Sequence, residues 1–195
     1  MENVTKNILC YSHIDFNNIM KKNEWYYKPG VNTSAISICS TNDELGDSTI
    51  HWFEDDCHDT VESVFNLDID DIGPYWFTDT NVDFYDMTFE LYINGNINES
   101  NSYFDYDDKY HILNWEEAFD LVKWIDNRIN NFDNTIYIHC AAGVSRSQGV
   151  VRYIIDTYGN QFNIVTNRNN PCITPNLHVT RMLKRAYWLL FDEKI

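Results

Sequence analysis

The sequence predicts an α/β domain whose central sheet is mainly parallel and flanked by helices. Apolar runs typical of strands alternate along the chain with segments that repeat apolar residues at helical spacing. The chain has 195 residues, 44% hydrophobic and 15% aromatic, which is enough to bury the core of one domain. We therefore expect residues 1–195 to form a single domain.

The first third of the chain supplies two predicted strands. Residues 1–32 mix apolar and polar positions without a clear period, so we expect them to wrap around the core. Residues 33–40 alternate with a period of two, which predicts a strand. Residues 61–72 predict a second strand, which ends in the carboxylates of Asp70 and Asp71.

The middle of the chain combines a polar segment with a clear helix. Residues 73–112 are rich in Asp, Asn, Tyr and Phe and are predicted to be an insertion, with a short strand or hairpin at residues 89–96. Residues 115–130 repeat apolar side chains at helical spacing. Asn114 is the expected N-cap of this helix, and Glu117 is placed to complete a capping box.

The last third predicts a strand and two helices. The apolar run at residues 135–138 indicates a buried strand, and residues 149–155 indicate a helix that ends at Gly159. A final helix is expected after Thr174, with Pro175 at its first position.

The stretch from His139 to Ser147 reads His-Cys-Ala-Ala-Gly-Val-Ser-Arg-Ser and joins that strand to the next helix. A loop that ends at a helix N-terminus directs backbone N–H groups and the positive end of the helix dipole into one concavity, which favours a bound dianion. Cys140 in that concavity is expected to have a lowered pKa and to act as a nucleophile. Arg146 can bind two phosphate oxygens through its planar guanidinium. Residues 135–159 therefore predict a phosphate-binding loop and its following helix.

The other loop residues have expected supporting roles. Gly143 permits a turn that a side chain would hinder. Ser147 is expected to donate a hydrogen bond to the sulfur and to ease its departure as a leaving group, and His139 is expected to position Cys140. The expected phosphate-binding residues are Ala141, Ala142, Gly143, Val144, Ser145 and Arg146.

This stretch resembles the cysteine-dependent protein phosphatases, whose pattern is His-Cys-x-x-Gly-x-x-Arg-Ser/Thr. Its Gly-Val-Ser-Arg-Ser ending is most like the dual-specificity branch and its small bacterial, phage or viral members. Residues 67–72 and the run Pro175-Asn176-Leu177-His178-Val179 are similar to two further segments of these enzymes. The resemblance implies a protein-tyrosine-phosphatase-like fold and hydrolysis of phosphomonoesters through a phosphocysteine intermediate at Cys140.

The family also implies a general acid, an aspartate on a mobile loop that protonates the leaving group and then acts as base toward water. Asp71 stands at the end of a predicted strand, which is the context that the family uses. Asp108 lies at about the sequence distance before the cysteine seen in compact dual-specificity enzymes. We favour Asp71, because a sheet edge fixes geometry whereas an insertion changes spacing freely. Asp108 is the alternative general acid.

Charge and loop composition narrow the expected substrates. The formal charge of −16 disfavours nucleic acids and is compatible with a basic protein partner. The loop interior lacks the lysines of phosphoinositide phosphatases, so a phosphorylated protein or a small phosphomonoester is the expected substrate. Phosphotyrosine alone and dual specificity both stay open. The alternative function is a catalytically weak module that binds a phosphorylated ligand or a basic protein partner.

The remaining expectations concern cofactors and location. No metal or other cofactor is expected, since thiolate, guanidinium and loop amides supply the electrostatics. The N-terminus lacks the features of a signal peptide, and no apolar run is long enough to span a membrane. Five scattered cysteines indicate a reducing compartment. We therefore expect a cytoplasmic, intracellular protein that binds no membrane, and a host cell is one compartment compatible with this expectation.

Overall fold

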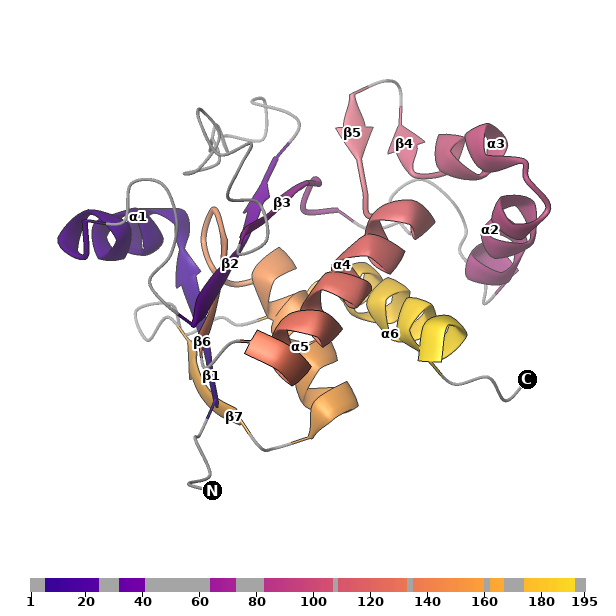
Figure 1. Ribbon diagram of the computed structural model, residues 1–195. Coiled ribbons are helices and arrows are strands. Elements are labelled where there is room, and N and C mark those ends of the chain that lie inside the picture. The colour runs from indigo at the N-terminus through magenta and orange to yellow at the C-terminus, as the bar shows by residue number, and fades with distance from the viewer. Residues whose placement is uncertain are drawn as a thin grey trace.

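A five-stranded sheet forms the centre of the computed structural model, which describes residues 6–24, 32–40, 64–72, 83–106, 109–132, 135–159, 162–166 and 174–191. All four pairs of neighbouring strands in this sheet are parallel. The strand order is β3 (Val64–Asp68), β2 (Thr33–Cys39), β6 (Thr135–Cys140), β1 (Lys6–Ser12) and β7 (Phe162–Thr166) (Figure 1). The predicted α/β class with a mainly parallel sheet is confirmed.

The register of the sheet brings the carboxyl ends of four strands to the same edge. Ser12, the last residue of β1, lies opposite Cys140, the last residue of β6. On the other side, β2 and β3 end together, with Cys39 opposite Asp68. Ligands of open parallel sheets bind beyond the carboxyl ends of the strands. The edge that carries Cys140 is therefore the place for a site.

Helices cover both faces of the sheet (Figure 1). A two-stranded antiparallel ribbon, β4 (Asp105–Tyr106) and β5 (Tyr110–His111), lies between the helices that precede and follow it in the chain. The helices are α1 (His13–Lys22), α2 (Asp83–Ile93), α3 (Ile97–Ser102), α4 (Trp115–Asn127) with a π-helical continuation (Arg128–Phe132), α5 (Arg146–Tyr158) and α6 (Leu177–Phe191).

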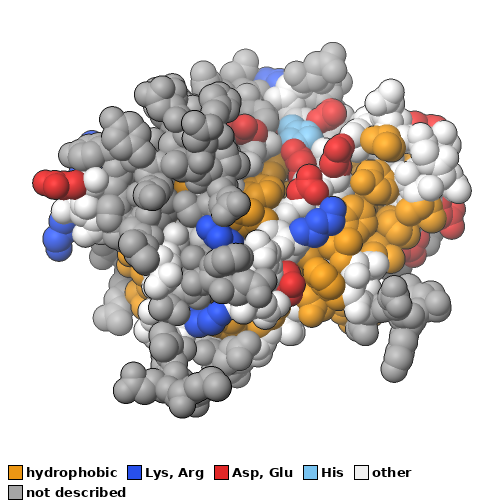
Figure 2. Space-filling view, in the orientation of Figure 1, with side chains coloured by type: hydrophobic (Ala, Val, Ile, Leu, Met, Phe, Trp, Pro, Cys, Tyr) orange, Lys and Arg blue, Asp and Glu red, His pale blue; other side chains and the backbone are white. Residues whose placement is uncertain are grey.

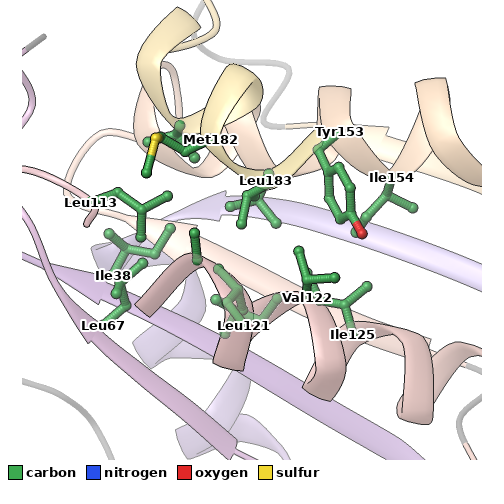
Figure 3. Packing of buried hydrophobic residues seen from close by; sticks show 14 of the residues in the cluster. Ile38, Leu67, Leu113, Leu121, Val122, Ile125, Tyr153, Ile154, Met182 and Leu183 are labelled. Carbon is green, nitrogen blue, oxygen red and sulfur yellow. The ribbon is translucent and has the colours of Figure 1, made fainter. Parts of the chain in front are cut away.

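Each face of the sheet has its own hydrophobic cluster, as the alternation of side chains along β2 requires. Ile36 and Ile38 belong to the large cluster with α4, α5 and α6, whereas Ala35 packs with Phe16 and Met20 of α1. Figure 3 shows the large cluster between the strands and these three helices. One of these helices, α5, begins directly after the loop that follows β6.

The predicted helix after Asn114 is confirmed in detail. Asn114 accepts a hydrogen bond from the backbone N–H of Glu117 at 3.0 Å, and the Glu117 carboxylate accepts one from the backbone N–H of Asn114 at 3.0 Å. The predicted buried face is also correct; it consists of Ala118, Leu121, Val122, Ile125 and Ile129.

Single residues next to the helices determine where α5 ends and where α6 begins. Gly159 follows α5 with φ +78°, a conformation that favours glycine, as the sequence predicts. The prediction that Pro175 opens the final helix is wrong. The side chain of Asn176 accepts a hydrogen bond from Val179 N–H at 3.1 Å, so Asn176 caps α6 and the helix begins at Leu177.

Two further expectations are corrected. Residues 6–12 form the inner strand β1 and do not wrap around the core; an inner parallel strand needs only the short apolar run around Ile8, which is too short to show a period. Residues 89–93 continue α2 and form no hairpin, because Phe84, Tyr85 and Thr88 are buried at helical spacing. Strand β7 was not predicted. The first part of the expected insertion, residues 73–82, lies outside the described residues.

Within the part of the chain that the structure describes, no helix combines the length and apolar character needed to cross a bilayer.

Candidate active site

Residues 141–145 form the loop between β6 and α5, so the predicted order of strand, loop and helix is confirmed. Groups outside the loop hold four of its carbonyl oxygens, with N···O distances between 3.0 and 3.1 Å. The donor and acceptor pairs are His13 N–H to Ala141, Gln148 Nε2–H to Gly143, Thr174 N–H to Val144, and Asn176 N–H to Ser145.

These outward carbonyls fix the direction of the loop amides. In a trans peptide the C=O of one residue and the N–H of the next point in opposite directions, and the described chain contains no cis peptide. The N–H groups of Ala142, Val144, Ser145 and Arg146 therefore face the inner side of the loop. No described residue accepts a hydrogen bond from the N–H of Ala142, Val144 or Ser145. Together with the N-terminus of α5, these amides form a cradle suited to an anion.

Gly143 lets the loop sit directly on the junction between β1 and α1. Its φ is +72°, and a Cβ there would lie 2.6 Å from the carbonyl carbon and oxygen of Tyr11 and 2.7 Å from the nitrogen of Ser12. Any side chain would collide with backbone that cannot move away easily. Glycine is thus required both by the turn and by the packing beneath it.

Cys140 and Ser147 meet at the base of the loop. The Cys140 Sγ lies 3.1 Å from the Ser147 Oγ, and the two residues are 2% and 0% exposed. A hydroxyl at this distance can donate to a sulfur anion and stabilise it. This contact has the geometry that the expected role of Ser147 requires.

Arg146 is buried and tied to a neighbouring strand end. Its Nη1 donates a hydrogen bond to the carbonyl oxygen of Ile69 at 2.8 Å, and the residue is 2% exposed. Ile69 immediately precedes the two aspartates after β3. One of the five N–H donors of the guanidinium is thus bound to the backbone next to the acidic segment.

Asp71 lies next to the loop. Its Oδ1 accepts hydrogen bonds from the Ser145 hydroxyl at 2.5 Å and from the Asn176 side-chain amide at 3.1 Å. No described residue donates to Asp71 Oδ2. The structure thus brings Asp71 to the same site as Cys140 and Arg146. The alternative acid, Asp108, lies outside the described residues.

Asp70 has a different, structural role. It is 1% exposed, and its Oδ2 accepts a hydrogen bond from the backbone N–H of His111 at 2.8 Å. Its own N–H donates to the His111 carbonyl oxygen at 2.7 Å, and the Ser40 hydroxyl donates to Oδ1. These bonds hold the segment after β3 against β5, which fixes the backbone that carries Asp71.

His139 lies on the α1 side of the sheet and is 0% exposed. Its ring stacks on Phe16 with 4.2 Å between centroids and meets the edge of His13 at 5.3 Å. His139 therefore anchors the end of β6 to α1, and His13 donates its backbone N–H to Ala141 in the loop.

Sequence reasoning missed two residues beneath the loop. The Gln148 side-chain amide donates to the Gly143 carbonyl and to the Cys10 sulfur, at 3.1 Å each. The pKa of the Cys10 thiol is raised to about 12, chiefly by burial; a hydrogen bond with Ser147 opposes this shift and the charge of Cys140 adds to it. Cys10 is therefore a neutral thiol that supports the loop. Its place could not be foreseen because β1 itself was not predicted.

Asn176 is the third missed residue, although its segment was noted for its resemblance to known phosphatases. Its backbone N–H holds Ser145, its side-chain amide donates to Asp71, and its side-chain oxygen caps α6. A Cβ on Gly149 would lie 2.8 Å from the Asn176 carbonyl oxygen, so only glycine allows α5 to approach this closely. Asn176 thereby links the loop, the acidic segment and α6.

His111 supports the site from the outer side. Its Nδ1 lies 2.5 Å from an Asp105 carboxylate oxygen and its Nε2 lies 2.9 Å from Glu117. Burial alone would lower the pKa of His111, but the hydrogen bonds and charges of Glu117 and Asp105 outweigh it and raise the pKa to about 9. The backbone of His111 also forms two hydrogen bonds with Asp70, so the ion pairs of His111 stabilise the backbone around Asp71.

We expect the folded state to lose stability at alkaline pH, because His111 then loses its proton and its ion pairs. A folded pKa of about 9, above the ordinary value of 6.5, contributes stability below pH 6.5 that is lost as pH rises through 9. After allowance for solvent screening the loss is about 1–2 kcal/mol. Urea unfolding of wild type and His111→Gln at about pH 6 and about pH 10 measures it. An identical pH dependence in the two proteins would contradict the expectation.

A search of protein-family models, a search of curated proteins and a search of solved structures found no match to this chain. Among the residues that the structure describes, no group of three or more His, Cys, Asp or Glu side chains could hold a metal ion.

Proposed function

We propose that the chain is a cysteine-dependent phosphatase that hydrolyses phosphomonoesters. The observation that carries the proposal is the inward direction of the loop N–H groups around Cys140. Amides at a helix N-terminus favour a dianion, and the buried Arg146 adds a fixed positive charge. A thiol at the base of such a cradle is placed to attack a bound phosphoryl group.

The proposed reaction has two steps. In the first, the Cys140 thiolate forms a bond to phosphorus, the ester P–O bond breaks, and Asp71 gives its proton to the leaving oxygen. In the second, the Asp71 carboxylate takes a proton from water, the water oxygen bonds to phosphorus, and the P–S bond breaks. Ser147 stabilises the departing sulfur, while the loop amides and Arg146 stabilise the charge on the equatorial oxygens.

We infer a phosphorylated protein as the substrate, with tyrosine alone or dual specificity both compatible with the site. The charge of −16 favours basic sequence around the phosphorylated residue. A thiolate nucleophile escapes oxidation only in a reducing compartment, so we place the reaction inside a cell. The alternative, a module that binds a phosphorylated ligand without turnover, uses the same cradle.

A radiolabelled aryl phosphate tests the proposal. We expect wild type to release phosphate under reducing conditions and to retain this activity in a chelator. Rapid quenching in denaturant should trap label on the peptide that contains Cys140. Label on another residue, or loss of turnover with the chelator, would overturn the mechanism. Tight binding of phosphate without any turnover would instead support the binding module.

A further inference from the structure

A groove lies between α2, α4 and α6, on surface formed by segments other than the phosphate loop. Its volume is about 480 Å³, within the range of about 300–1,000 Å³ for ligand pockets. Figure 2 shows a band of hydrophobic side chains on the side of the molecule where these helices meet, with charged side chains along one edge. The lining residues are Phe89, Tyr92, Ile93, Glu116, Phe119, Asp120, Lys123, Leu189 and Leu190.

The lining is aromatic and aliphatic, and it continues into exposed surface. The rings of Tyr92 and Phe119 lie 5.7 Å apart, centroid to centroid. Ile93 is 59% exposed and Leu189 is 36% exposed. The same turn of α6 as Leu189 also exposes Trp188. Large side chains exposed together in this way mark an interaction surface more often than scattered single ones do. Their extension beyond the groove fits a peptide segment better than a small enclosed ligand.

The charged residues at the rim of the groove favour a partner of positive charge. Glu116 and Asp120 stand one turn apart on α4, and Lys123 lies 3.4 Å from Asp120. Burial raises the pKa of the Tyr92 hydroxyl, and the negative charges of Glu116 and Asp120, which face this ring, raise it as well. The charge of −16 on the whole chain acts in the same direction. A second copy of the chain would meet this potential with its own negative charge.

We propose that this groove docks a segment of a partner protein that carries aliphatic or aromatic side chains next to lysine or arginine. The apolar side chains fill the space between Phe119 and Leu189, and the basic groups lie against Glu116 and Asp120. Apolar anchors supply most of the affinity of such contacts, while the charges supply rate and selectivity. The inference does not depend on the proposed hydrolase activity, because the groove uses none of the loop residues.

A labelled synthetic peptide of leucines and lysines at amphipathic helical spacing tests the docking surface by fluorescence anisotropy. Two matched peptides separate the contributions, one with serine for leucine and one with glutamate for lysine. We expect only the leucine–lysine peptide to bind, and to bind more weakly as salt is raised. Equal binding of the serine peptide would overturn the proposal, because charge alone would then explain the affinity.

Variants of the protein locate the binding. Leu189→Asp and Ile93→Asp, both at exposed positions, should each weaken binding at least about tenfold. Glu116→Gln should weaken it less and reduce its salt dependence. Ile14→Asp, at a 71% exposed position on α1 across the sheet, is the control and should bind as wild type does. Equal binding by Leu189→Asp and wild type would overturn the proposal. So would a wild-type dimer that Leu189→Asp converts to monomer.

Discussion

Replacement of Cys140 by serine is expected to lower kcat for an aryl phosphate by about 10⁴-fold or more. A serine hydroxyl does not ionise near neutral pH, and the hydrogen-bond partner that the described residues give the Cys140 Sγ is the Ser147 hydroxyl, which is no base. The loop amides and Arg146 remain, so binding of inorganic phosphate should change little. Steady-state kinetics and calorimetric titration with phosphate measure the two effects separately.

Cys39→Ala is the control for this variant, because Cys39 is also a buried cysteine at the end of a strand. It should keep wild-type turnover within a few-fold. If Cys140→Ser retained turnover within tenfold of wild type, the proposed nucleophile would be wrong. If both variants lost turnover together with phosphate binding, the loss would reflect folding, which thermal unfolding would show directly.

The parts of the site that lie close in sequence could be predicted. The strand ending at Cys140, the loop and the helix beginning at Arg146 are continuous, so residue types at fixed spacing determine their order. The cap of α4 was predictable for the same reason, since both partners of the capping box lie three residues apart. Burial on α4 followed from its helical period.

The parts that depend on distant segments could not be predicted. Cys10 supports the loop from a strand whose short apolar run shows no period. The contact of Arg146 with Ile69 joins residues 77 positions apart, and that of Asn176 with Asp71 joins residues 105 positions apart. Spacing along the chain carries no information about such contacts. The helix α2 was missed because Phe89, Glu90 and Leu91 alternate apolar, acidic and apolar as in a strand, although the acidic residues over the whole segment fall at helical spacing.

Replacement of Asp71 by asparagine is expected to slow hydrolysis in a way that depends on the leaving group. Two hydrogen bonds to Oδ1, from Ser145 and Asn176, leave Oδ2 as the oxygen that can carry a proton to the ester. An amide cannot transfer that proton, so kcat/KM for phenyl phosphate should fall by about 10²–10⁴-fold. A dinitrophenyl phosphate, whose leaving group needs no proton, should lose far less.

Asn176→Ala should show the same pattern at smaller amplitude, because Ser145 still holds Asp71 while one of its two donors is gone. A purely structural loss would slow both substrates equally, so the ratio of the two rates distinguishes a positioning role from a folding defect. Asp86→Asn is the matched control, at a carboxylate that is 63% exposed and paired with Arg185 on α6. The placement of the general acid would be wrong if Asp71→Asn left the ratio unchanged while Asp108→Asn altered it. That outcome would assign the proton to the segment between β4 and β5 and leave Asp71 as a support for Ser145.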